Sequence, residues 1–256
     1  MYKKRENFVK IASGVQHLVA ENFLKTSFSQ NIESLPVLCY SYIRPKRSIY
    51  VEIGENMNEK FFDLKKEKQD RMINAALKVF SKGGYKHAST DDIVGEAGIS
   101  KGLLFHYFGS KLGLYSFLYD YSVRFMKLEL TGGVSSTERD YFEIRRQMEY
   151  AKMQVLKNYP YMQQFLDRCR FEDVSEALMA IERQKNVLSD MQAVLKNQSD
   201  RSLFKSEVNY EKLDQMVTYT LDGLMDSRFQ DSSFHPDMLY EESCAYLNML
   251  KALSYR

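Results

Sequence analysis

The chain has 256 residues but no tryptophan, four prolines and three cysteines. The cysteines, Cys39, Cys169 and Cys244, are odd in number and far apart, so their spacing indicates neither a disulfide framework nor a zinc site. We therefore expect reduced thiols, with a redox-sensing cysteine as the alternative.

Sequence patterns typical of common enzyme classes are also missing. The four histidines stand apart without metal-ligand spacing, and there is no P-loop, no GxGxxG and no GxSxG motif. We expect no catalytic residue, no cofactor and no metal site. A small-molecule enzyme stays open as an alternative, because catalytic groups can come together in the fold without any local motif.

No apolar run reaches the roughly 18 residues that a membrane-spanning helix needs. Lys3, Lys4 and Arg5 resemble the start of an export signal, but no apolar segment follows them. We expect a cytoplasmic protein without a membrane partner.

The net charge is only +2 but is unevenly spread. Residues 57–112 hold ten Lys and Arg against seven Asp and Glu, and residues 113–256 hold eighteen Lys and Arg against twenty-two Asp and Glu. Because residues 57–112 are basic and residues 113–256 are acidic, this distribution favours nucleic-acid binding by residues 57–112 alone.

Residues 72–111 carry the most informative pattern, which predicts three short helices. An apolar stripe at i, i+3, i+4 and i+7 marks the first helix: Ile73, Ala76, Leu77 and Phe80. Gly83 and Gly84 are expected to end it, because glycine reaches the backbone conformation that a helix end needs.

The second and third helices of this segment are marked by their caps. Ser89 and Thr90 can each cap the second helix, whose inner face is formed by Ile93 and Ala97. Gly98 permits a tight turn, and Ser100 caps a third helix, which we expect over 101–108. Helix, tight turn and helix in this register predict a helix-turn-helix.

The third helix is the predicted recognition helix. Leu104 and Phe108 lie four residues apart and are expected to face the core, which leaves Lys101 and its neighbours for base edges and phosphates in the major groove. Ser110 then caps a following helix, and Lys111 places a positive charge at its N-terminus.

With these motifs, the segment 72–111 closely resembles the DNA-binding domain of TetR/AcrR-family transcriptional regulators, and the resemblance extends weakly to the end of the chain. It implies DNA contacts from eight residues: Thr90, Lys101, Gly102, Leu103, Phe105, His106, Tyr107 and Lys111. The chain departs from the family at Leu103, where a small polar residue is common, at Phe105, where tyrosine is common, and at Gly113, where an acid often completes the helix cap.

We predict an all-α fold: a three-helix DNA-binding domain over 57–112, then a helical ligand-binding and dimerisation domain over 113–256. Helices are expected within the second domain over these ranges: 111–130, 137–158, 160–173, 174–198, 206–229 and 236–253. The family forms its dimer with the last two helices, so the apolar stripes there predict interface residues, although both stripes could instead face the subunit's own core. The predicted interface residues are Met216, Thr220, Leu221, Leu224, Tyr246, Leu247 and Leu250.

The second domain is also expected to enclose a ligand pocket. Adaptable apolar side chains on its helices are the candidates, although plain core packing is the alternative for each. These candidates are Met153, Phe165, Met179, Met191, Met216 and Tyr219.

Residues 1–56 do not fit the family pattern. A helix is possible over 6–24, and two β-like runs occupy 37–43 and 48–53. One hypothesis is that translation starts at Met57, and the other is that this segment is an extension that adds basic contacts to DNA.

The complete pattern predicts a homodimeric, ligand-responsive transcriptional regulator, most simply a repressor on a palindromic operator. Its partners would be double-stranded DNA, a second copy of the chain and an unknown small-molecule effector. A helical DNA-binding protein without an effector is the alternative.

Overall fold

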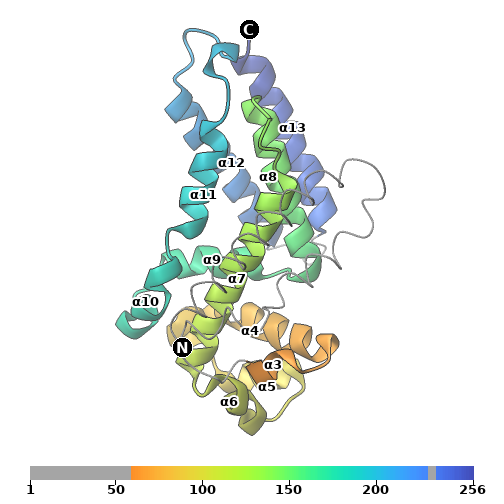
Figure 1. The fold of residues 1–256 in the computed structure, drawn as a ribbon, viewed down its shortest axis with the longest axis vertical. Helices are drawn as coiled ribbons and strands as arrows, with labels where there is room; N and C mark the ends of the chain where they lie inside the picture. The colour runs from red at the N-terminus through yellow and green to blue at the C-terminus, as the bar shows by residue number, and fades with distance from the viewer. Residues whose placement is uncertain (1–58, 230–234) are drawn as a thin grey trace, which may run out of the picture. The chain divides into compact units, whose positions relative to one another are not determined.

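The computed structural model describes residues 59–229 and 235–256, which belong to one compact unit and form helices joined by turns (Figure 1). The all-α prediction is confirmed for this part of the chain. Cys39, the expectations for residues 6–24 and 36–53, and the two hypotheses on the start of the chain lie outside the described residues.

The first helices are α3 (Glu59–Phe62), α4 (Lys66–His87), α5 (Thr90–Ala97) and α6 (Lys101–Phe108). The predicted recognition helix has the expected bounds. The first helix runs to His87, beyond the expected stop, but it kinks at Gly84, whose φ of 59° lies in the left-handed region. The glycine pair therefore breaks the helix axis without ending the helix.

Five of the seven remaining helices in the described residues correspond to predicted ranges, and the other two fall within one predicted range that the structure divides. Their bounds are α7 (Lys111–Gly133), α8 (Tyr141–Asn158), α9 (Met162–Arg170), α10 (Ser175–Ile181), α11 (Val187–Asn197), α12 (Tyr210–Phe229) and α13 (Pro236–Ser254). The single helix expected over 174–198 is wrong, because a short 3-10 turn, Glu182–Gln184, separates α10 from α11. The helix expected over 111–130 is three residues longer in the structure, because α7 ends at Gly133.

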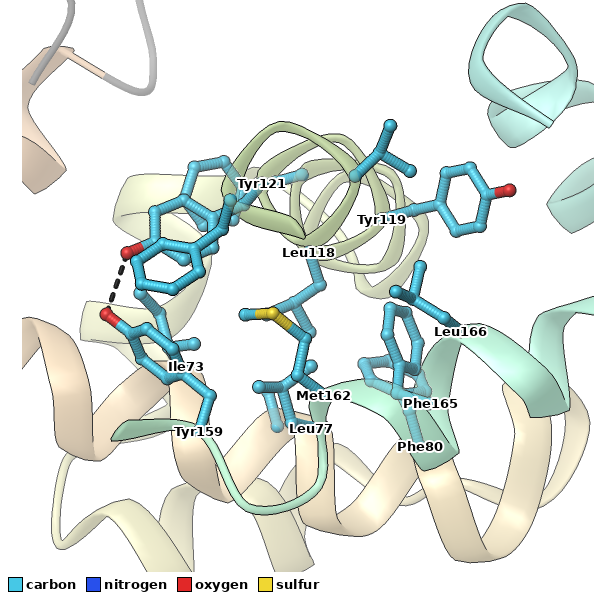
Figure 2. Packing of buried hydrophobic residues seen from close by; sticks show 14 of the residues in the cluster. Ile73, Leu77, Phe80, Leu118, Tyr119, Tyr121, Tyr159, Met162, Phe165 and Leu166 are labelled. Atoms are coloured by element: carbon cyan, nitrogen blue, oxygen red, sulfur yellow. Dashed lines mark hydrogen bonds between the residues drawn. The ribbon is translucent and has the colours of Figure 1, made fainter. Parts of the chain in front are cut away.

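A main core joins the first helices to those that follow. Side chains of α4, α7 and α9 meet in it, among them Leu77, Leu118 and Phe165 (Figure 2). The same figure shows Tyr121 and Tyr159 joined through their hydroxyl oxygens, which lie 2.7 Å apart. Because this core crosses residue 112, the described residues on the two sides of the predicted boundary belong to one packing unit.

A second core lies among α8, α12 and α13, and α13 packs on both of the others. It consists of Tyr141, Phe142, Phe204, Leu213, Val217, Leu221, Leu247 and Leu250. This core positions the last two helices against α8.

Two further expectations, on membrane-spanning helices and on the cysteines, can be compared with the described residues. None of the helices within them combines the length and apolar character needed to cross a bilayer. Cys169 is buried and accepts a hydrogen bond from the Tyr115 hydroxyl at 3.1 Å. Burial raises the pKa of the Cys169 thiol to about 12, so its reactive thiolate form is scarce near neutral pH.

Candidate nucleic-acid interface

Local capping holds the helix-turn-helix in shape. The Ser89 Oγ accepts a hydrogen bond from the backbone N–H of Asp91 at 3.1 Å, and the Ser100 Oγ accepts one from that of Leu103 at 3.2 Å. Between the two helices, Gly98 has a φ of 62°, a conformation that a side chain would strain. The tight turn and both helix starts thus follow directly from serine and glycine at these positions.

The recognition helix α6 separates its residues by face, as the sequence predicts. Leu104 and Phe108 are buried in the main core. Lys101, Gly102 and His106 are exposed on the other side. The core residues therefore fix the rotation of α6 about its axis and leave its polar side open for a partner.

Leu103, Phe105 and Thr90 are only half-buried. Leu103 packs against the edge of the main core, yet part of its side chain stays accessible at the start of α6. A leucine there offers apolar contact, which suits a thymine methyl and cannot bond a phosphate.

Tyr107 lies differently from the expectation, because it is buried and not on the outer side of α6. Its ring packs at 5.8 Å, centroid to centroid, against Phe61 of α3. Phe61 also packs against Phe108 at 5.1 Å and Phe117 at 5.3 Å, so α3 belongs to the same aromatic cluster as the recognition helix. The pair Phe61-Phe62 ahead of α4 was the available sequence signal for this docking, and we missed it.

Lys101, at the first position of α6, is paired within the protein. Its Nζ lies 2.9 Å from Oδ1 of Asp91, which stands in the first turn of α5, and both side chains are largely exposed. Exposed ion pairs of this kind contribute little to stability. The pair can therefore open when a phosphate offers a competing partner.

This pairing predicts that Asp91→Asn strengthens DNA binding. Removing the carboxylate frees Lys101 and takes a negative charge away from the approaching phosphates, so the affinity for any DNA sequence should rise roughly three- to tenfold at low salt. Fluorescence anisotropy with random-sequence duplex DNA measures it. Asp92→Asn is the control, because Asp92 also stands in the first turn of α5 and is not the partner of Lys101. Equal effects of the two changes would mean that only net charge matters.

Lys111, at the start of α7, is half-buried against the end of α4. Its Nζ lies 4.7 Å from the ring centroid of Tyr85 and donates a weak hydrogen bond of 3.5 Å to the backbone oxygen of Lys86. Burial lowers the pKa of Lys111, and the charges of Glu172 and Glu176 act in the opposite direction. Because Lys111 rests on the last turn of α4, its position depends on that of the kinked helix end.

Glu172, just after α9, bridges this helix end to the rest of the protein. One carboxylate oxygen accepts the backbone N–H of Tyr85 at 2.9 Å and the Tyr115 hydroxyl at 3.3 Å. The other accepts the backbone N–H groups of Asp173 and Val174, both at 3.2 Å. The segment after α9 is thereby fastened to the end of α4 and to α7.

The six predicted ligand-contact residues differ widely in burial, and their contact with a ligand stays a prediction. Phe165 and Met153 are buried, and Phe165 packs between Phe80 and Tyr115 as an ordinary core residue. Met191 is half-buried on α11. The other three are exposed: Met179 at 80%, Met216 at 46% and Tyr219 at 72%. Helical spacing placed these residues on helices but could not assign the face on which each one lies.

The predicted dimer residues also divide into two groups. Leu221, Leu247 and Leu250 are buried in the subunit's second core, so the interface assignment is wrong for these three. Thr220 and Leu224 are half-buried, and Met216 and Tyr246 are exposed.

A set of apolar residues on the last two helices is uncovered, and it shares Met216 and Tyr246 with the predicted set. On α12 these are Met216 and Tyr219, and Gly223 has open space where a side chain would stand. On α13 they are Met238, Tyr246, Met249 and Leu253. We call this set the exposed α12–α13 face. It is the outer side of the helices whose inner side forms the second core.

Comparison with known proteins places the helix-turn-helix in a family. Residues 72–116 match the model described as bacterial regulatory proteins, tetR family. Among solved structures, a TetR family transcriptional regulator from Chloroflexus aurantiacus J-10-FL is 20% identical with a TM-score of 0.53, over 77% of this chain and 98% of that one. A TetR family regulator from Agrobacterium tumefaciens is 18% identical with a TM-score of 0.52, over 72% of this chain and 97% of that one.

No curated protein sequence matches the chain. At these identities the two solved structures show a shared fold, and the family match rests on the helix-turn-helix segment itself. That segment is also where the capping serines, the turn glycine and the exposed face of α6 meet. Residues 72–116 thus match the DNA-binding domain of the tetR family of bacterial regulatory proteins, and the chain shares its fold with the two tetR-family transcriptional regulators.

Proposed function

We propose that this regulator is a homodimeric repressor that binds a palindromic operator and releases it when a small molecule binds among α7–α12. The observation that carries the proposal is the exposed polar face of α6, held in one orientation by Leu104 and Phe108. Two copies related by a two-fold axis would present two such helices to successive major grooves. A regulator acts where its DNA is, so we propose a cytoplasmic location.

The exposed α12–α13 face supports the dimer. Single apolar residues are common on protein surfaces, but a face shared by two adjacent helices is typical of an interaction site. Its methionines and tyrosines are residue types enriched in the centres of interfaces. A two-fold axis through this face would pair α12 and α13 with their copies.

The contacts of Glu172 support ligand control. A molecule bound among the later helices changes DNA affinity only if it favours one arrangement of the DNA-binding helices. Glu172 and the shared main core link α9 to the end of α4, where Lys111 rests on Tyr85. A shift of α9 would therefore move a predicted phosphate contact.

Lys111→Ala tests whether this lysine faces DNA. Loss of one phosphate contact per subunit should weaken binding to every sequence and flatten the plot of log affinity against log salt by about 0.9 per lost contact. Titrations of an operator fragment at several salt concentrations measure both quantities. Lys82→Ala, an exposed lysine on α4, serves as the control. An unchanged slope of log affinity against log salt would show that Lys111 does not contact DNA.

Leu103 and His106 stand where base edges are read, so their replacement should change sequence preference more than overall affinity. Leu103→Ser and His106→Ala are expected to alter the operator selected from a random duplex library at the half-site positions nearest α6. Lys111→Ala should leave the selected sequence unchanged. The same selection performed with the unaltered chain tests the proposed function itself, because a non-palindromic consensus would contradict a two-fold dimer.

A further inference from the structure

A charged side chain is buried between α8 and α12, where apolar packing would be expected. Arg145 on α8 is 6% exposed, and its Nε has no hydrogen-bond partner within the described residues. Its Nη1 lies 3.4 Å from Thr218 Oγ1 and 3.7 Å from Asp214 Oδ1, both on α12. A buried guanidinium with an unused donor is costly and is rarely kept without a purpose.

Asp214 does not neutralise Arg145 on its own, because other groups share its carboxylate. One oxygen accepts the Tyr141 hydroxyl at 2.7 Å, and the other accepts the Lys196 ammonium at 2.6 Å. Burial would raise the pKa of Asp214, but Lys196 and Tyr141 bind its charged form and hold the pKa below its usual value. One negative charge therefore stands between two positive ones.

The buried acid of α8 is already paired. Glu149, one turn further along α8, lies 3.0 Å from the ammonium of Lys152. The seam formed by Arg145, Asp214 and Lys196 thus keeps an excess of one positive charge and a free donor at Arg145. An anion is the missing counterpart.

The helix beside this seam is the most loosely packed long helix of the later part of the chain. None of the side chains of α11 is fully buried, although it is 11 residues long. Its apolar side, formed by Val187, Leu188, Met191 and Leu195, is only half-buried against the main core. Lys196, the last-turn lysine of the same helix, reaches Asp214. Separating α11 from the core would open apolar surface directly beside the charged seam.

We propose that Arg145 is the anchor of the effector site and that the effector is an amphipathic carboxylate. Its carboxylate would accept hydrogen bonds from Arg145 and draw Lys196 away from Asp214, and its apolar part would lie along the inner side of α11. This inference rests on the proposed ligand control and specifies its chemistry. A carboxylate matches this site, because its planar two-oxygen group fits the guanidinium edge.

Matched ten-carbon probes test the chemistry of the head group. Isothermal titration of the full-length protein with decanoate, decyl sulfate, decanol and decylamine below their micelle-forming concentrations is expected to show binding by decanoate and at least tenfold weaker binding by decanol. Decylamine should not bind. A preference for decyl sulfate would retain the anion site but contradict the assignment of a carboxylate. Tighter binding of decanol or decylamine than of decanoate would contradict the anion site, and so would the absence of binding by every probe.

Arg145→Met tests the anchor. It leaves Asp214 paired with Lys196, so the seam stays charge-balanced and the fold should persist, as far-UV circular dichroism and DNA binding would verify. Decanoate binding should weaken about 10- to 100-fold. Lys212→Met, an exposed lysine on the same helix as Asp214, should not change it. Arg145→Lys keeps the charge but loses the planar fork, so it should bind decanoate with intermediate affinity.

Equal binding by the Arg145→Met variant and the unaltered protein would overturn the inference. Should Arg145→Met fail to fold, the Arg145→Lys variant decides, because decanoate affinity unchanged in that variant would exclude a role for the guanidinium. DNA release is measured separately with the operator fragment. Decanoate that binds through Arg145 but leaves the operator complex intact would contradict the proposed ligand control and retain the anion site.

Discussion

Gly113→Ala is expected to lower the free energy of unfolding by about 3 kcal/mol or more, a large effect for adding one methyl group. A Cβ built at Gly113 would lie 2.1 Å from the backbone oxygen of Phe108, a distance that neither backbone segment can relieve without moving. The Ser110 Oγ meanwhile accepts the backbone N–H of Gly113 at 3.0 Å and holds the two segments together. Urea denaturation followed by circular dichroism measures the loss.

Gly102→Ala is the matched control. Gly102 lies inside α6, and a Cβ there would meet nothing within 4 Å. Alanine in a helix is favoured over glycine by about 0.5–1 kcal/mol, so stability should stay equal or rise slightly. A denaturation midpoint that Gly113→Ala leaves unchanged would show that the Phe108–Ser110 turn does not approach α7 as closely as described.

The helix-turn-helix was predictable because its determinants are local. Ser89, Gly98 and Ser100 act on residues within four positions of themselves, and the side chain or the backbone freedom of each fixes the conformation there. The inner position of Leu104 follows from helical periodicity alone. Such features require no knowledge of distant parts of the chain.

The environment of the outer face of α6 was not predictable, because distant residues determine it. Tyr107 is buried by Phe61, which precedes it by 46 residues and belongs to a helix that the sequence did not reveal. Lys101 is paired with Asp91 of the preceding helix, a contact that depends on the angle between α5 and α6. Charge and periodicity identify exposed candidates, but they do not say which neighbour a side chain meets.

The last two helices show the limit of periodicity more sharply. Each carries apolar residues on two sides, and one side must pack on the subunit before any dimer can form. Leu221 and Leu247 occupy the inner side, whereas Met249 and Tyr219 occupy the outer one. Only the position of α8 distinguishes the two sides, and no local sequence signal records it.

Charge inside the later helices was likewise invisible in the sequence. Arg145 lies between Ile144 and Arg146 in a helix rich in charged residues, yet it is buried, as is Glu149 of the same helix. Its burial follows from the way in which α12 places Asp214 and Thr218 opposite α8. Lysine and arginine are normally counted as surface residues, so sequence reasoning favoured methionine and aromatic side chains as ligand contacts.

Met249→Glu is expected to split the proposed dimer and to reduce specific operator affinity at least 100-fold. Met249 is 52% exposed in the C-terminal half of α13, so the free subunit tolerates a carboxylate there and should keep its fold. In a two-fold dimer the change would bury two carboxylates in one apolar interface, at a cost of several kcal/mol. Sedimentation equilibrium at micromolar concentration measures the association, and anisotropy with a palindromic duplex measures the affinity.

Met179→Glu is the matched control, because the same substitution falls on a methionine that is 80% exposed on α10, away from the exposed α12–α13 face. It should leave both association and operator binding unchanged. Leu247→Glu, in contrast, would place a carboxylate in the second core and should unfold the subunit before any effect on assembly can be read. A folded Met249→Glu variant that remains dimeric would exclude the exposed α12–α13 face as the interface. An unaltered chain that sediments as a monomer yet binds the palindrome tightly would exclude the dimer itself.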